Sequence, residues 1–272
     1  MTRIESPKNP QVKALVKLRE RRTREREKRY LIEGAREVGR ALSAGVELET
    51  LYVCEGFLNA EGEAVLARAI HLERIDLSEL AFQKVSYRDT PDGLLAVAPM
   101  LETSLESVTV TQNALFLVVD GLEKPGNLGA LLRTADGVDV DAVFVTGAGT
   151  DLTNPNVIRA SMGSVFSRPV LNVETDELLA WLRAHEVTIV ATTPHTETSY
   201  WEADYTSAVA VVLGAEHKGL SEAWLGAAQS RVSIPMRGLA DSLNVGTAGA
   251  LLLYEAVRQR RASSRAVSGA RF

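Results

Sequence analysis

Three short polar segments lie far apart in this chain, and each combines small residues with side chains that could do chemistry. A guanidinium can hold a phosphate through two parallel hydrogen bonds, whereas amide, carboxylate and hydroxyl groups orient a reacting group. Ordinary helix capping or tight-turn chemistry would explain any one segment alone. The side chains concerned are Asn127 and Arg133 in the first segment, Glu216 in the second, and Ser242 and Asn244 in the third.

The segments follow apolar runs of the kind that forms strands buried on both faces of a parallel sheet. Because ligands of open α/β sheets bind beyond the carboxyl ends of the strands, we expect the three segments to share one pocket. The clearest runs are residues 114–119, 142–145, 187–191 and 208–213. Helices are expected at residues 128–136, 155–166, 176–185, 222–228 and 246–261.

A nucleotide-binding Rossmann domain is the main alternative for this half of the chain. The turn after the first strand, residues 120–127, lacks the Gly-x-Gly-x-x-Gly pattern, and no phosphate-loop motif is present in the sequence. If a helix begins near Leu128, Asn127 caps it and Arg133 lies about two turns further along.

The N-terminal part begins with a strongly basic arm. Residues 8–29 contain ten Lys or Arg against three Glu, and the apolar stripe Val12, Leu15, Val16 and Leu18 ends at residue 18. A solvated helix with internal Glu–Arg pairs is one interpretation. The large positive excess favours an arm that binds phosphate. We expect Arg21, Arg22, Arg24 and Arg26 to contact the phosphates of a nucleic acid.

Beyond the arm, short β and α patterns alternate as in a small three-layer α/β/α domain. A polar, proline-containing linker near residues 99–113 separates it from the apolar runs. The expected organisation is a basic N-terminal domain at 1–104, an α/β domain at 112–262 and a flexible basic tail at 263–272.

Bulk composition narrows the class of protein. The 272 residues carry a net charge of −5, so contact with nucleic acid must come from local basic patches. One cysteine, Cys54, excludes an internal disulfide, and the four histidines have no metal-ligand spacing. No apolar run has the length of a membrane span, and no signal peptide is evident. We expect a cytoplasmic protein with no metal and no membrane partner.

The three segments together resemble the signature motifs of the SpoU (TrmH) family of RNA ribose 2′-O-methyltransferases, in the SPOUT superfamily. The first reads Asn-x-Gly-x-x-x-Arg, the second Gly-x-Glu-x-x-Gly, and the third Ile-Pro-Met followed by Ser-Leu-Asn-Val. Residues 30–34 and 92–97 look like parts of the substrate-binding domain that precedes many of these catalytic domains. That domain resembles ribosomal proteins that bind RNA kink-turns.

The resemblance implies a C-terminal parallel-sheet domain with a deep trefoil knot, which holds S-adenosylmethionine and forms a homodimer. Sites in this family are often completed across the dimer interface. The implied catalytic residues are Asn127, Arg133, Glu216, Ser242 and Asn244. The implied cofactor-binding residues are Ala191, Thr192, Gly214, Ile234, Met236 and Leu243. Arg159 and Lys218 are further candidates for RNA contact.

The implied reaction is methyl transfer from S-adenosylmethionine to a ribose 2′-hydroxyl of structured RNA. The extra N-terminal domain favours ribosomal RNA over transfer RNA. A guanidinium is a poor base because its pKa exceeds about 12, so Arg133 suits phosphate binding better than proton abstraction. The alternatives are a transfer-RNA enzyme, methylation of a base, and a catalytically silent RNA-binding or ribosome-assembly protein.

Overall fold

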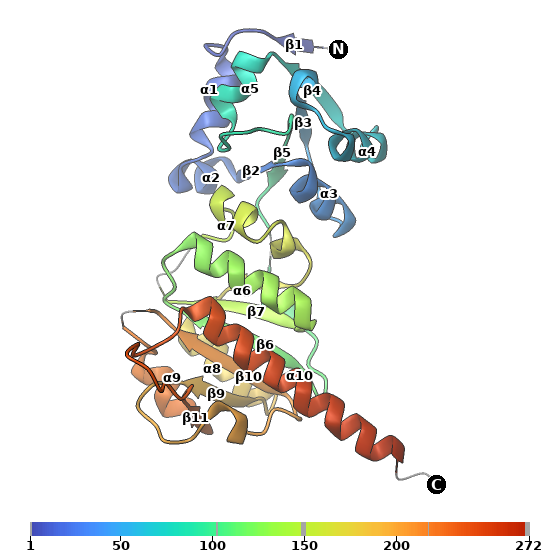
Figure 1. Ribbon diagram of the computed structural model, residues 1–272. Helices are drawn as coiled ribbons and strands as arrows, with labels where there is room; N and C mark the ends of the chain where they lie inside the picture. Colours follow the sequence, from blue (N-terminus) through green and yellow to red (C-terminus); the bar gives the residue numbers. More distant parts are fainter. Residues whose placement is uncertain (1, 102, 148–150, 217, 270–272) are drawn as a thin grey trace. The chain divides into compact units, whose positions relative to one another are not determined.

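The computed structural model describes residues 2–101, 103–147, 151–216 and 218–269, which form two compact units (Figure 1). The N-terminal unit comprises Met1–Glu102 and Asp151–Ser167, and the C-terminal unit comprises Thr103–Thr150 and Arg168–Phe272. Residues 151–167 were expected inside the C-terminal domain, but their contacts place them in the N-terminal unit. The chain therefore leaves the C-terminal unit after its second strand and returns to form the third.

The C-terminal unit contains a six-stranded sheet in the order β11-β9-β10-β6-β7-β8, and every neighbouring pair is parallel. The parallel α/β class is thus confirmed. Residues of β6 and β7 are buried along their whole length, as the uninterrupted apolar runs predicted. The strands are β6 (Leu115–Asp120), β7 (Ala142–Thr146), β8 (Val170–Asn172), β9 (Thr188–Thr192), β10 (Val209–Gly214) and β11 (Ser230–Val232).

Helices cover both faces of this sheet. One face packs its alternate side chains, such as Phe116 and Val118, in a cluster with residues of α8 and α9. Helices α6 and α10 lie side by side on the other face (Figure 1). The helices of this unit are α6 (Pro125–Val138), α8 (Thr175–Ala184), α9 (Glu222–Ala227) and α10 (Val245–Gly269), with 3-10 turns η2 (Leu105–Ser107) and η4 (Tyr200–Glu202).

Small residues allow α6 and α10 to approach closely. A Cβ atom added to Gly249 of α10 would lie 2.3 Å from Cδ2 of Leu131 in α6 and 2.8 Å from Cδ1 of Leu213 in β10. Real Cβ atoms do not tolerate such distances, so glycine fits here without strain on the neighbouring leucines. Helix α10 also continues beyond its expected end, which makes residues 263–269 of the expected tail helical and leaves 270–272 outside the described residues.

The N-terminal unit has a five-stranded mixed sheet in the order β1-β4-β3-β5-β2. Strands β1, β4 and β3 are parallel, whereas β5 is antiparallel to both β3 and β2. Helix α1 packs with α5, and α3 packs with α4. The strands are β1 (Thr2–Ile4), β2 (Arg29–Glu33), β3 (Thr50–Val53), β4 (Glu73–Leu77) and β5 (Leu94–Pro99). The helices are α1 (Pro10–Lys17), α2 (Arg21–Glu27), α3 (Ala35–Ser43), α4 (Ala60–Arg68), α5 (Glu79–Val85) and α7 (Pro155–Ala160), with 3-10 turns η1 (Glu55–Phe57) and η3 (Ser164–Phe166).

The basic arm forms two helices, α1 and α2, and several of its arginines have partners within the protein, among them the exposed ion pair of Arg21 with Glu25 at 2.7 Å. Arg19 donates hydrogen bonds to the carbonyl oxygens at the end of α5, including that of Val85 at 2.7 Å. Arg24 was predicted to contact RNA, but its side chain is only 1% exposed. It donates to the carbonyls of Leu18 at 2.8 Å and Arg19 at 2.7 Å, and it forms an ion pair with Asp151. A buried, paired guanidinium cannot bind phosphate, so the prediction for Arg24 is wrong.

The Arg24–Asp151 pair attaches the returning segment 151–167 to the N-terminal unit. Burial by itself would raise the pKa of the Asp151 carboxyl, but hydrogen bonds from Arg24 and Thr153 and the charge of Arg24 hold that pKa below its ordinary value. Thr153 donates to Oδ1 of Asp151 through both its hydroxyl at 2.7 Å and its backbone N–H at 2.9 Å. The carboxylate is therefore ionised and fully engaged.

Candidate active site

Residues from all three sequence motifs meet in one hydrogen-bonded cluster within the C-terminal unit. Asn127 donates from Nδ2 to Oε1 of Glu216, which lies 89 positions away in sequence. Asn244, 117 positions from Asn127, donates from its own Nδ2 to Oδ1 of Asn127 at 3.2 Å. Glu216 follows β10 and Asn244 precedes α10, so the fold brings together groups that the sequence separates widely.

Lys124 is a fourth member, which sequence reasoning did not assign to the site. Its Nζ lies 2.5 Å from Oε2 of Glu216, and the exposed fractions of the two side chains are 65% and 21%. Both carboxylate oxygens of Glu216 accept hydrogen bonds, and the group lies at the N-terminus of α6, where the helix dipole favours an anion. We call Lys124, Asn127, Glu216 and Asn244 the amide–carboxylate cluster. Both oxygens of the Glu216 carboxylate are therefore engaged within the cluster.

Asn127 takes a different place in its helix from the one predicted. Helix α6 begins at Pro125, with Lys124 in the capping position, so Asn127 is the third helical residue rather than the cap. Proline suits the first helical position because its φ is already helical and its missing N–H has no intrahelical partner there. This earlier start leaves the Asn127 amide available to Glu216.

Asn244 caps the other helix of the site. Its Oδ1 accepts a hydrogen bond from the backbone N–H of Gly246 at 2.9 Å, in the first turn of α10. That bond fixes the amide oxygen, and the amide nitrogen is left to reach Asn127. The start of α10 and the start of α6 are thereby connected through two side-chain amides.

Asp120, at the carboxyl end of β6, stabilises the backbone next to the cluster. Its buried carboxylate accepts a hydrogen bond from the hydroxyl of Thr146 at 2.9 Å and another from the backbone N–H of Ser221 at 3.1 Å. The second bond holds the end of the turn that carries Glu216. A carboxylate that ends an otherwise apolar strand was the available sequence signal for this residue.

The turn that carries Glu216 needs glycine at its first position. A Cβ atom on Gly214 would lie 2.3 Å from the carbonyl carbon of Gly219, because the two ends of the turn approach closely. A backbone bridge joins Ala215 to Gly219 across the turn. Gly214 is thus required by the turn itself, before any ligand is considered.

Arg133 and Ser242 do not join the cluster. Arg133 is exposed on α6, and an offset of six residues in an α-helix places it roughly 120° around the helix axis from Asn127. Among the described residues, neither Arg133 nor Ser242 makes a side-chain hydrogen bond or ion pair. The structure therefore brings together Asn127, Glu216 and Asn244 and leaves Arg133 and Ser242 facing solvent.

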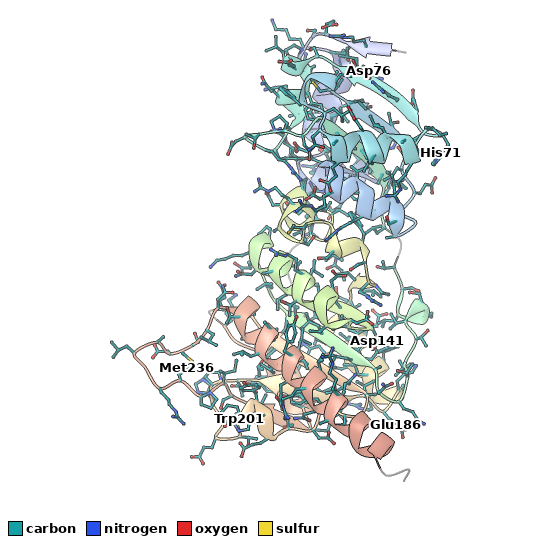
Figure 2. All side chains as sticks on the ribbon, turned by 45° about the vertical axis from the view of Figure 1, so that its right-hand side comes forward. His71, Asp76, Asp141, Glu186, Trp201 and Met236 are labelled. Atoms are coloured by element: carbon teal, nitrogen blue, oxygen red, sulfur yellow. The ribbon has the colours of Figure 1, made fainter. Side chains whose placement is uncertain are left out.

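Five of the six predicted cofactor-binding residues lie at or just after the carboxyl ends of neighbouring strands, and the sixth, Leu243, lies just before α10. Thr192 ends β9, pairs with Val232 of β11 and donates its hydroxyl to the carbonyl of Val212 at 2.5 Å. Ala191 precedes it and is buried, and Gly214 ends β10. Figure 2 labels Met236 on the loop that follows β11.

The six predicted cofactor-binding residues are chemically similar to one another. Ile234 and Met236 are half-buried and Leu243 is 36% exposed, so they offer partly open apolar surface. None of the six predicted residues is charged. An uncharged, partly apolar set suits a neutral heterocycle, which backbone groups of such loops can recognise by hydrogen bonding.

The remaining predicted RNA contacts are at the surface. Lys218 is exposed in the same turn as Glu216, whereas Arg159 is exposed in α7 of the N-terminal unit. Arg21, Arg22 and Arg26 of the arm are also exposed. Within the described residues, no group of three His, Cys, Asp or Glu could hold a metal ion. The same residues include no helix that is long and apolar enough to cross a membrane.

The C-terminal unit combines a parallel sheet with an Asn–Glu–Asn cluster, and it is joined to a second, smaller α/β unit. Comparison with protein families identifies the class of RNA-modifying proteins to which both units correspond. Residues 114–254 match the SpoU rRNA Methylase family, and residues 9–96 match the MRM3-like substrate binding domain. The chain belongs to the SpoU rRNA methylase family, so the resemblance seen in the motifs is confirmed.

Individual relatives align over almost the whole chain. A 23S rRNA (uridine(2479)-2′-O)-methyltransferase of Streptomyces viridochromogenes is 32% identical over 92% of this chain and 89% of its own length. A crystal structure of an RNA 2′-O ribose methyltransferase is 52% identical, covers 95% of this chain and 99% of its own, and superposes with a TM-score of 0.85. The SpoU methyltransferase AviRb from S. viridochromogenes in complex with AdoMet is 30% identical, covers 93% and 98%, and has a TM-score of 0.86.

Proposed function

We propose that this protein transfers a methyl group from S-adenosylmethionine to a ribose 2′-hydroxyl in structured RNA, with ribosomal RNA as the favoured substrate. The observation that carries the proposal is the amide–carboxylate cluster, in which side chains from three distant motifs are hydrogen-bonded to one another. Family membership and the AdoMet complex of a relative support the same cofactor for this chain.

In this reaction the bond from the ribose oxygen to the methyl carbon forms while the carbon–sulfur bond of the cofactor breaks, and the hydroxyl proton leaves. S-Adenosylmethionine supplies an activated methyl group when it is bound. The protein's part is to hold the hydroxyl in line with that methyl group and to fix the adjacent phosphate. Asn127 and Asn244 orient the substrate, Glu216 holds both Lys124 and Asn127 in place, and Arg133 binds the phosphate. The proton passes to phosphate or water, because Glu216 is already engaged and a guanidinium stays charged.

The protein is further proposed to act as a homodimer through α6 and α10. Leu251 and Tyr254, which are 36% and 56% exposed, lie three positions apart on α10 and so place two large apolar side chains on one exposed face of the helix. Alongside them, α6 exposes a stripe of small residues with Arg133 among them: Gly126, Ala130 and Gly137. We expect sedimentation to give a dimer for the wild type and a monomer for a Leu251→Glu/Tyr254→Glu variant. A wild type that stays monomeric at micromolar concentration contradicts this proposal, and Leu80→Glu, at an exposed leucine of the N-terminal unit, is the matched control.

The domain roles follow the same reasoning. Residues 1–104 are proposed to select the folded RNA, residues 112–262 to hold the reaction site within the trefoil knot expected of the family, and the basic C-terminal end to add charge. The cytoplasm, where ribosomal RNA is modified, is the proposed location. The packing of α10 against both α6 and β10 supports the proposed knot, because a knotted C-terminal segment must contact earlier parts of the same unit.

The activity is tested by treating ribosomal RNA with the protein and S-adenosylmethionine and measuring the nucleosides by mass spectrometry. We expect a 2′-O-methylated nucleoside from the wild type and a loss of about 100-fold or more for Asn244→Ala, which removes an orienting amide. A methylated base would replace the proposal with base methylation. Failure to bind S-adenosylmethionine by calorimetry would favour the silent RNA-binding alternative, and methylation of transfer RNA alone would exclude ribosomal RNA as substrate.

A further inference from the structure

A groove in the N-terminal unit has no assigned role. It lies between helices α1 and α2 and one face of the mixed sheet, and its volume is about 710 Å³. Pockets of roughly 300–1,000 Å³ are typical of small-molecule and nucleotide ligands. All of its lining residues belong to the N-terminal unit, so the groove is separate from the amide–carboxylate cluster.

The floor of the groove is apolar. Leu15 and Leu18 of the arm meet Ile75 of β4 and Val97 of β5 there, and all four side chains are largely buried. Such a floor offers contact area to a flat, weakly polar group without supplying any charge. A nucleobase is a group of this kind, because each base has an apolar face on which it can pack.

One wall carries two lysines that form no ion pair within the part of the chain that the structure describes. Lys13 and Lys17 line the groove, lie one helical turn apart on α1 and are exposed. Neither forms an ion pair among the described residues, whereas Arg26 and Arg29 of the same groove are paired with Glu27 at 2.9 Å and Glu49 at 2.7 Å. The two lysines are therefore the available cations for phosphate.

The groove is also lined by carboxylates at the amino-terminal ends of β3 and β4. Glu49 and Glu73 line the groove beside Thr50, whose hydroxyl donates to Glu73 at 3.3 Å. A carboxylate accepts hydrogen bonds, so it favours bases that present N–H donors, such as cytosine or guanine. These carboxylates would repel a ligand that consisted of phosphate alone. The lining therefore favours a ligand that has both phosphates and a base with N–H donors.

We propose that this groove binds one unstacked nucleotide of a single-stranded RNA segment. The base lies on the apolar floor with its N–H edge toward Glu49 and Glu73, and Lys13 and Lys17 hold the flanking phosphates. The inference rests on the proposed RNA substrate and specifies which surface of the N-terminal unit holds it. Single-stranded RNA suits the site because its bases can be splayed out, whereas bases within a duplex cannot enter such a groove.

The test is to fill the groove. Ala14 is an exposed groove residue of α1, and Ala64 is an exposed alanine of α4 outside the groove, so Ala14→Trp and Ala64→Trp form a matched pair. Binding of a short, fluorescein-labelled single-stranded RNA is measured by anisotropy. We expect Ala14→Trp to weaken binding about tenfold, the loss of one base contact, and Ala64→Trp to leave it within about twofold.

A second variant probes the cations without filling the groove. Lys13→Gln/Lys17→Gln removes two phosphate contacts, so the slope of log affinity against log salt concentration should become less negative by about 1.4. For the methylation reaction, both groove variants should raise KM for RNA and leave kcat and the affinity for S-adenosylmethionine unchanged, because neither touches the reaction site.

The outcomes separate this inference from the proposed function. The proposal for the groove is contradicted if folded Ala14→Trp protein binds the RNA as tightly as the wild type does. It is also contradicted if the wild type prefers duplex RNA. A wild type that binds single-stranded RNA through the groove but never methylates it overturns the proposed function and leaves the groove intact. Circular dichroism of each variant establishes that it is folded.

Discussion

Replacing Arg133 with alanine is expected to lower the rate of methyl transfer by about 100-fold or more, because a charge-assisted phosphate contact is lost at the reaction step. The affinity for S-adenosylmethionine should stay within about twofold, since Arg133 lies on an exposed face of α6, whereas the predicted cofactor residues follow β9, β10 and β11. Single-turnover methylation and calorimetry with the cofactor measure the two effects separately.

Arg133→Lys is the matched control. It keeps the charge but loses the planar fork of donors, so it should recover only part of the rate. Thr134→Ala, at the next position of α6, should retain nearly full activity. A collapse of cofactor affinity in Arg133→Ala would show that the guanidinium serves the cofactor, which contradicts the proposed role.

The position of Arg133 also predicts a result for mixed dimers. Within one chain Arg133 is exposed on α6 and lies outside the amide–carboxylate cluster, so we propose that it completes the site of the partner subunit. Arg133→Ala and Asn244→Ala proteins, each inactive alone, should then regain activity when mixed, because one site of the heterodimer contains neither substitution. A mixture that stays inactive while exchanging subunits would place Arg133 and Asn244 in the same site of one chain.

Arg24→Ala is expected to destabilise the N-terminal unit by about 3–5 kcal/mol, because it removes a fully buried guanidinium and leaves the partly buried carboxylate of Asp151 without its cation. Denaturant unfolding followed by circular dichroism measures this loss. Arg22→Ala, two positions away on the exposed face of α2, should change stability by less than about 0.5 kcal/mol. Equal effects of the two substitutions would mean that the burial of Arg24 contributes nothing.

The same pair predicts a dependence on pH. Because the pKa of Asp151 is lowered in the folded protein, its stabilisation is complete above the unfolded value of about 3.9 and is lost as pH falls through the folded pKa. The wild type should lose stability in this acid range, and Asp151→Asn should lack that component of the loss. If both proteins follow the same acid profile, Asp151 is not the titrating group.

Sequence pattern predicted most of the fold because long elements leave a periodic or continuous signal. The four long parallel strands of the C-terminal unit appeared as apolar runs, since both faces of their sheet are covered. Strands β1 and β8 were missed because each has three residues, too few to show a period. The place of residues 151–167 depends on long-range contacts, namely the Arg24–Asp151 ion pair, a hydrogen bond from Arg40 to the carbonyl of Met162 and the stacking of Tyr30 on Phe166, and composition does not reveal these.

The candidate site was predicted in part, for a physical reason. Motif spacing indicated that Asn127, Glu216 and Asn244 belong together, and they are hydrogen-bonded to one another. The role of Lys124 in the cluster was not predicted, because a lysine that precedes a proline is common in exposed turns and carries no specific signal. Arg24 was assigned to RNA because a charge count cannot distinguish an exposed guanidinium from one that is 1% exposed.

The return of residues 151–167 to the N-terminal unit affects how this protein can be divided. The chain crosses between the units three times, at 102/103, 150/151 and 167/168, so excision at the linker does not separate them. A fragment that starts at residue 112 would carry an orphaned segment whose buried side chains, among them Val157, Ile158 and Phe166, have lost their partners. Any exchange of the substrate-binding half for another, in the laboratory or in evolution, must therefore replace this inserted segment as well.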